Sequence, residues 1–79
     1  VQVPTLEEVL ARFPGVPMNI EIKAENPPSV IEPFVELLDR YRMRPHVLVA
    51  SFSDTLLFSF RAAAPDVLTS LSPLEVAQL

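Results

Sequence analysis

Apolar and polar residues alternate strictly between positions 18 and 23, and the chain then enters Ala24-Glu25-Asn26-Pro27-Pro28, where no strand can continue. This alternation predicts one short strand over residues 18–23, with two different faces, because successive side chains of a strand point to opposite sides. The expected strand has an apolar face, Met18, Ile20 and Ile22, and a polar face, Asn19, Glu21 and Lys23.

Apolar residues at helical spacing predict helices on either side of this strand. The first helix begins after Thr5 and is stopped by Pro14-Gly15, where the only glycine of the chain is expected to take a positive φ. The second runs to about Arg42, with Pro33 in its first turn. Three segments match the capping-box pattern at helix starts: Thr5 with Glu8, Ser29 with Glu32, and Ser72 with Glu75.

The second half of the chain repeats the alternation of strand and helix. Residues 47–52 are almost continuously apolar, which predicts a parallel strand buried on both faces. A helix capped by Ser53 or Asp54 follows and ends at Pro65-Asp66, and residues 67–71 form a third short strand. A fourth helix starts at Pro73. This order of elements predicts an α/β fold with a parallel sheet covered by helices.

Composition narrows the class of protein. The chain has 79 residues, and a hydrophobic content of 49% is too high for a disordered segment. A formal net charge of -4 leaves no basic surface for a nucleic acid, so nucleic-acid binding is disfavoured. The chain has no cysteine, which excludes disulfides, thiolate metal sites and a cysteine nucleophile. No apolar run reaches the ~20 residues that cross a bilayer.

The predicted sheet has two unpaired edges, which a complete domain would normally extend or cover. The chain also starts at Val1, and its last residues fall inside the expected fourth helix. We therefore expect residues 1–79 to be a partial domain, incomplete at both ends.

Four segments together carry a resemblance to a known family: Val3-Pro4-Thr5-Leu6-Glu7-Glu8-Val9-Leu10, Asn19-Ile20-Glu21-Ile22-Lys23, Val49-Ala50-Ser51-Phe52 and Arg61-Ala62-Ala63-Ala64-Pro65-Asp66. In order and spacing they resemble the middle of the glycerophosphodiester phosphodiesterase family. The first segment alone is a generic capping box, but joined to Asn-Ile-Glu-Ile-Lys it is fairly specific. The resemblance implies a (β/α)8 TIM barrel of typically ~250 residues, of which this chain would supply about a third, in three βα units.

The resemblance also implies an activity and two site residues. It implies a metal-dependent phosphoric diester hydrolase that cleaves glycerophosphodiesters into glycerol 3-phosphate and an alcohol. Glu21 takes the position of a ligand to a divalent cation, Mg²⁺ or Ca²⁺, and Lys23 the position of a catalytic lysine near the phosphate. Both roles make physical sense, since hard cations prefer carboxylate oxygens and a phosphodiester transition state gains negative charge. With a rise of ~3.3 Å per residue, the two residues lie about 7 Å apart along one strand face.

Several parts of the family's site are absent from this chain. The family has a His-Arg-Gly motif, an acidic pair of metal ligands and a second catalytic histidine, none of which occurs here. His46 cannot replace them, because it precedes its strand and so belongs to the amino end of a barrel. We expect this chain alone to be inactive and to depend on the remainder of the barrel.

Other interpretations stay open. Judged by spacing alone, Glu21 and Lys23 are better explained as a structural ion pair or a solvated strand face, and only the resemblance reverses this preference. The chain could then be a non-catalytic βα module that binds a partner, and a related phospholipase D-like barrel phosphodiesterase is a further alternative. Ser51 lies near a strand end but more simply bonds to backbone, Asn19 more simply fills the barrel floor, and Phe52 is expected to pack under a helix.

Overall fold

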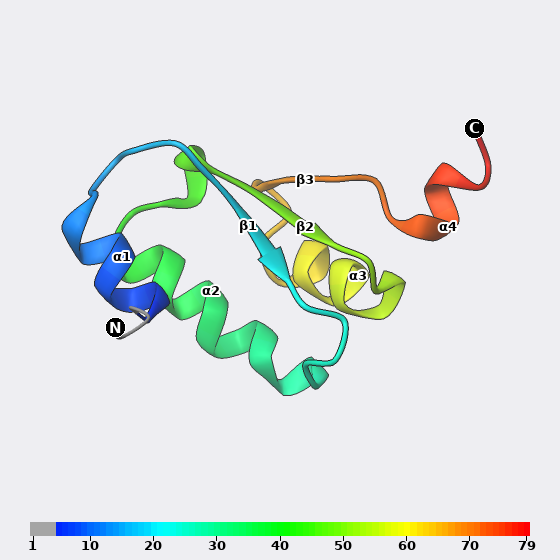
Figure 1. The fold of residues 1–79 in the computed structure, drawn as a ribbon, viewed down its shortest axis with the longest axis horizontal. Helices are drawn as coiled ribbons and strands as arrows, with labels where there is room; N and C mark the ends of the chain where they lie inside the picture. Colours follow the sequence, from blue (N-terminus) through cyan, green and yellow to red (C-terminus); the bar gives the residue numbers. More distant parts are fainter. Residues whose placement is uncertain (1–4) are drawn as a thin grey trace, which may run out of the picture.

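The computed structural model describes residues 5–79 and contains a parallel sheet of three strands. The strands lie in the order β1-β2-β3 and span Met18–Ile22, Val47–Ser51 and Leu68–Thr69. The helices are α1 (Leu6–Arg12), α2 (Ile31–Arg40), α3 (Asp54–Ala63) and α4 (Pro73–Val76). In Figure 1, α1, α2 and α3 lie on one side of the strands, and α4 lies beyond the end of β3 near the C-terminus. The predicted parallel α/β fold is therefore confirmed, but the sheet is not closed into a barrel.

The first helix begins and ends where local signals predict. The Thr5 hydroxyl accepts from the Glu8 backbone N–H at 3.2 Å, and the Glu8 carboxylate accepts from the Thr5 N–H at 3.4 Å, which completes the capping box. The helix ends at Arg12, and Gly15 has a φ of +73°. Val3 and Pro4, at the start of the segment that carries the family resemblance, lie outside the described residues.

The predicted capping box at Ser29 and Glu32 is wrong. Residues Pro28–Val30 form a 3₁₀ turn, η1, in which the Val30 N–H donates to the Pro27 carbonyl at 3.0 Å. Ser29 therefore lies inside a helical turn, whereas an N-cap residue needs an extended backbone. The α-helix begins only at Ile31, without a side-chain cap. The two prolines start the helical turn earlier than the capping pattern suggests, because their fixed φ suits a first turn.

Helix α2 and strand β3 are both shorter than the sequence predicts. The second helix ends at Arg40 rather than near Arg42, whose φ of +53° is left-handed and incompatible with a continuing helix. The third strand keeps only Leu68–Thr69 of the predicted residues 67–71, although the Ser70 N–H still donates to the Val49 carbonyl at 2.9 Å.

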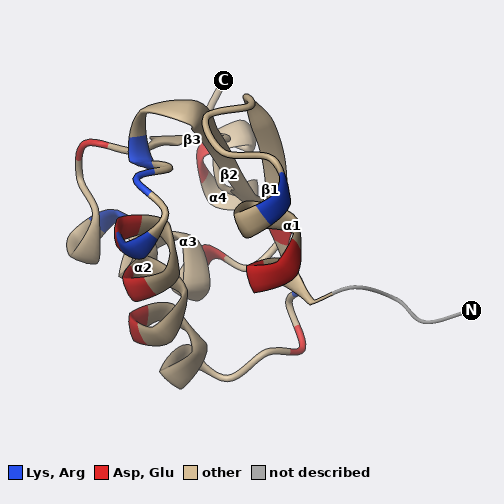
Figure 2. Ribbon diagram, turned by 90° about the vertical axis from the view of Figure 1, so that its left-hand side faces the viewer, with Lys and Arg blue, Asp and Glu red and all other residues tan. Residues whose placement is uncertain are grey.

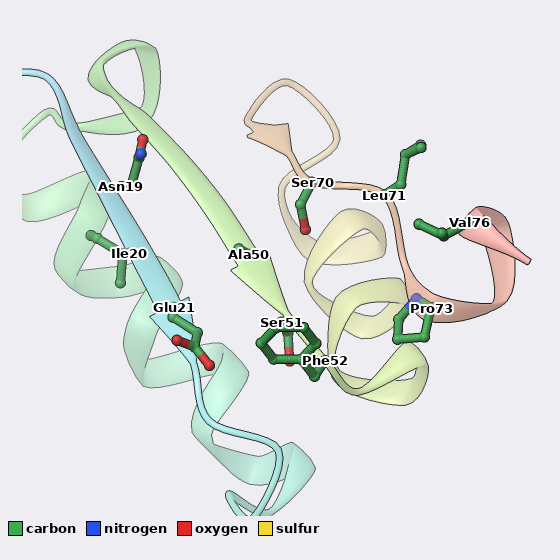
Figure 3. A pocket seen from close by; sticks show the side chains of 10 residues that line it. All are labelled: Asn19, Ile20, Glu21, Ala50, Ser51, Phe52, Ser70, Leu71, Pro73 and Val76. Atoms are coloured by element: carbon green, nitrogen blue, oxygen red, sulfur yellow. The ribbon is translucent and has the colours of Figure 1, made fainter.

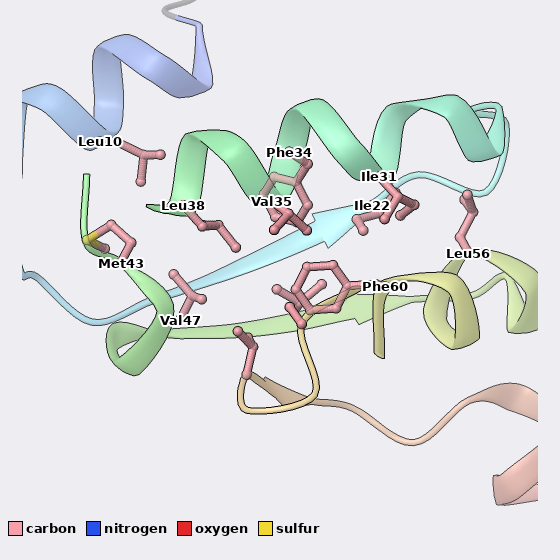
Figure 4. Close-up of a cluster of buried hydrophobic side chains, with 13 residues drawn as sticks. Leu10, Ile22, Ile31, Phe34, Val35, Leu38, Met43, Val47, Leu56 and Phe60 are labelled. Carbon is pink, nitrogen blue, oxygen red and sulfur yellow. The ribbon is translucent and has the colours of Figure 1, made fainter. Parts of the chain in front are cut away.

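The hydrophobic core lies between the sheet and the helices α2 and α3 (Figure 4). Phe34 from α2 and Phe60 from α3 meet at its centre, with ring centroids 5.5 Å apart. Strand β2 contributes Val47 and Val49, which are buried on the same side. The alternating residues Leu48 and Ala50 are only partly buried, so the prediction that this strand is buried on both faces is wrong for the described part of the chain. The reason is that the crossover helices cover only one face.

Charged side chains join the helices at the surface. The Glu7 carboxylate of α1 accepts hydrogen bonds from Tyr41 at 2.9 Å and from Arg40 at 2.7 Å, which ties α1 to the end of α2. These two donors, Tyr41 first, hold the pKa of Glu7 below its ordinary value. Arg44 likewise donates to Asp66, at 2.6 Å, across the amino end of the sheet. Figure 2 shows acidic positions recurring along α2 and basic positions at and just beyond its carboxyl end.

Candidate active site at the carboxyl end of the sheet

Glu21 and Lys23 come together at the carboxyl end of β1, as the sequence predicts. Glu21 is paired in register with Ala50 of β2, and it points to the face that α2 and α3 leave open. Lys23 lies just past the last strand residue, and its Nζ is 3.5 Å from a Glu21 carboxylate oxygen. The side chains of Lys23 and Glu21 are 64% and 40% exposed, so both are accessible to a ligand.

An open cavity of about 760 Å³ lies beside Glu21 on this face of the sheet. Figure 3 shows Asn19 and Glu21 of β1 on one side of it and Val76 of α4 on the other, with Ala50 of β2 between them. The residues between β3 and α4 complete the far wall. The carboxyl end of a parallel sheet is the usual place for a ligand in α/β proteins, so this cavity is the candidate site.

Phe52 is the lining residue that the sequence analysis placed wrongly. It was expected to pack under a helix, but its side chain is 79% exposed and projects from the end of β2 over the cavity (Figure 3). The pattern of β2 contains the signal that would have found it. Since Val47, Val49 and Ser51 share the buried face, Phe52 must share the opposite face with Ala50.

Ser51 borders the cavity, but its hydroxyl is occupied by bonds to the backbone. Its side chain is buried, and its hydroxyl donates to the Ile22 carbonyl at 2.8 Å and accepts from the Ser53 N–H at 3.1 Å. These bonds join the ends of β1 and β2 and start the turn into α3. The interpretation that Ser51 bonds to backbone is thus confirmed.

An ion pair between Arg61 and Glu75 lies behind the wall opposite Glu21, which is formed by Ser70, Leu71, Pro73 and Val76. Arg61 Nη2 and Nη1 donate to the two Glu75 oxygens, each at 2.8 Å. Together with the backbone of Ser72, this guanidinium lowers the pKa of Glu75 to about 2. The sequence analysis did not find this pair, because its partners lie on different elements.

The described residues do not form a metal site by themselves. Within residues 5–79, no group of three or more His, Cys, Asp or Glu side chains is arranged to hold a metal ion. Glu21 offers one exposed carboxylate, a ligand type that Mg²⁺ and Ca²⁺ accept but not a sufficient set. His46 ends the 3₁₀ turn η2 (Arg44–His46) directly before β2, so it lies at the amino end of the sheet, as predicted.

No helix in the described part of the chain is long and apolar enough to span a membrane.

Comparison with known proteins finds one informative relative. No protein-family model matches the chain. No solved structure matches it either. The chain is 42% identical over 52 residues, 66% of its length, to the Probable glycerophosphodiester phosphodiesterase 2 of Mycobacterium tuberculosis. The matched stretch covers 19% of that relative, about a fifth of its length. Over this stretch, the chain is homologous to part of a glycerophosphodiester phosphodiesterase.

Proposed function

We propose that residues 1–79 are a segment of a metal-dependent glycerophosphodiester phosphodiesterase with a (β/α)8 barrel. The observation that carries the proposal is the position of Glu21 and Lys23. The Lys23 Nζ lies 3.5 Å from a Glu21 carboxylate oxygen, and both side chains are exposed at the carboxyl end of a parallel sheet. The chain that carries them is partly homologous to such an enzyme. The reaction would convert a glycerophosphodiester into glycerol 3-phosphate and an alcohol.

The topology supports the barrel. The strands are neighbours in their sequence order, and the crossover helices α2 and α3 cover the same face. Right-handed crossovers that always advance in one direction place every helix on one side, which is the arrangement of a barrel wall. A doubly wound sheet reverses its strand order and carries helices on both faces. The open face with Glu21 would then be the inside of the barrel, and the rest of the barrel would cover the sheet edges.

Glu21 would supply one oxygen ligand to a divalent cation, and the other ligands would come from segments outside this chain. The cation would act as a Lewis acid on the phosphodiester. Lys23 carries a flexible ammonium that can approach a phosphate oxygen as a point charge. The ammonium lies 3.5 Å from a Glu21 carboxylate oxygen, at the edge of the site. The isolated chain has one candidate ligand and is expected to be inactive.

The test uses the longer protein that contains this segment. Release of glycerol 3-phosphate from glycerophosphocholine is measured with and without EDTA, in the wild type and in Glu21→Gln. We expect EDTA to abolish release and the variant to lose at least about 100-fold in kcat, with an unchanged circular dichroism spectrum. Glu36→Gln is the matched control, since it removes an exposed carboxylate from α2 on the helix layer.

Three results would contradict the proposal in different ways. Full activity of Glu21→Gln would exclude this residue as a ligand and leave it as a strand-end ion-pair residue. Activity on other phosphodiesters but not on glycerophosphocholine would favour a phospholipase D-like relative. Absence of all hydrolysis, together with binding of another protein, would favour a non-catalytic βα module.

A further inference from the structure

The wall of the cavity opposite Glu21 has little regular structure of its own. Strand β3 contributes two residues, Leu68–Thr69, and α4 is a single turn of four, Pro73–Val76. Residues 70–76 nevertheless take a defined path along the cavity, with Leu71, Pro73 and Val76 lining it (Figure 3). Such short elements do not hold a position by their own hydrogen bonds, so the fixed path needs contacts from elsewhere.

Arg61, on the last turns of α3, supplies those contacts at three points of the segment. Its Nε donates to the Thr69 hydroxyl at 2.9 Å, and its Nη2 donates to the Ser70 carbonyl at 2.9 Å. The two Glu75 oxygens accept from Nη1 and Nη2 at 2.8 Å. One Glu75 oxygen also accepts from the Ser72 N–H at 2.8 Å, so the same carboxylate starts α4 and is held by the guanidinium. A single side chain therefore joins the end of β3, the connecting loop and the start of α4.

The geometry needs arginine rather than positive charge alone. A guanidinium presents its N–H donors in a rigid plane and pairs with a carboxylate at two points, while a lysine ammonium offers a compact charge without this fork. The Phe58 ring, one turn earlier on α3, lies 5.7 Å from the guanidinium carbon and supports its plane. The Arg61 side chain is 30% exposed, so most of it is shielded from competing water.

We propose that Arg61 is a positioning residue whose guanidinium fixes residues 69–75 and thereby sets the far wall of the substrate cavity beside Glu21. The link to substrate rests on the proposed function, whereas the fixing of the loop does not. A second hydrogen bond holds the same segment to the start of α3, where the Asp54 carboxylate accepts from the Leu74 N–H at 2.9 Å. Loss of Arg61 should therefore loosen the segment without unfolding the sheet.

The first experiment measures the loop directly. In the longer protein that contains this segment, amide hydrogen exchange of Ser70 and Val76 is followed by NMR in the wild type, Arg61→Met, Arg61→Lys and Arg40→Met. We expect exchange at both amides to rise about tenfold in Arg61→Met and nearly as much in Arg61→Lys, because lysine restores charge but not the fork. Arg40→Met removes the comparable pair with Glu7 elsewhere on the surface and should leave both amides unchanged. Equal exchange in all four proteins would overturn the proposal.

The second experiment measures the effect on substrate in the longer protein. We expect Arg61→Met to raise KM for glycerophosphocholine about tenfold while kcat changes less, since the metal and Glu21 are untouched. An unchanged KM despite faster loop exchange would overturn the positioning role. The two proposals fail separately. An active Glu21→Gln would refute the metal-ligand role and leave the exchange result standing, whereas an inactive Glu21→Gln with an unaffected Arg61→Met would refute only the inference on Arg61.

Discussion

Phe60 lies at the centre of the core, and its truncation should remove a large part of the stability of the fold. The side chain is 0% exposed and packs against Phe34 at a centroid distance of 5.5 Å. Phe60→Ala deletes a buried ring and leaves a cavity between α3, α2 and the sheet, which costs about 3–5 kcal/mol in comparable cores. The lost ring pair accounts for about 0.5–1.5 kcal/mol of an effect of this kind.

The cost of Phe60→Ala is large relative to the total free energy of unfolding of the chain. At roughly 0.05–0.15 kcal/mol per residue, a chain of 79 residues has a free energy of unfolding of roughly 4–12 kcal/mol. An open sheet face and unpaired edges place this chain toward the lower end of that range. We therefore expect Phe60→Ala to remove about half or more of the stability, and the variant is expected to be partly unfolded at 37 °C.

The assay is urea unfolding followed by circular dichroism, with Phe58→Ala as the matched control. Phe58 lies on the same helix but is 41% exposed, and its ring centroid lies 5.7 Å from the Arg61 guanidinium carbon. Its truncation should cost about 1 kcal/mol or less, because little apolar area returns to water. A loss below about 1 kcal/mol for Phe60→Ala, or equal losses for both variants, would refute the assignment of Phe60 as the centre of the core.

Three further outcomes follow from local geometry. Gly15→Ala should cost about 1 kcal/mol in urea unfolding, although no atom lies within 4 Å of the added Cβ, because a φ of +73° disfavours L-residues; Gly15→Asn should cost less. Ser51→Ala should cost about 1–3 kcal/mol in the same assay, since the Ile22 carbonyl loses its buried donor. The pKa of Glu75, lowered from 4.5 to about 2 by Arg61, implies that its stabilising contribution is fully present above the ordinary carboxyl pKa, declines below it and is gone once pH has fallen through about 2. Side-chain ¹³C NMR should show that midpoint, and Arg61→Met should raise it.

The elements that the sequence predicted well are those set by near neighbours. The Thr5 and Ser72 capping boxes join residues three positions apart, so the local sequence is enough to predict both helix starts. The same holds for Gly15, whose conformation follows from its place at a helix end. Ser29 shows the limit of this approach. Its pattern matched a capping box, but the preceding prolines favour a 3₁₀ turn that includes Ser29. This turn forms in place of the capping box.

The parts that the sequence did not predict depend on contacts between distant segments. Arg61 and Glu75 are 14 positions apart, and Glu7 and Tyr41 are 34 apart, so no periodicity identifies either pair. The candidate site shows the same division. Alternation along β1 was enough to place Glu21 on the open face, whereas Phe52 needed the knowledge that only one face of β2 is covered by helices.

The open face of the sheet mixes groups that a simple hydrophobic cover could not bury together. Strand β2 and the following residue present Ala50 and Phe52 there, while β1 presents Asn19 and Glu21. A carboxylate that loses water without a partner pays a large desolvation cost, and Lys23, itself 64% exposed, offers only one weak contact at 3.5 Å. Any segment or ligand that covers this face must therefore bring positive charge or hydrogen-bond donors to Glu21 or leave it in water. A divalent cation held by Glu21 would meet that requirement, and an apolar protein partner would not. The electrostatics of the face thus favour the proposed phosphodiesterase site over a module that binds through its apolar surface alone.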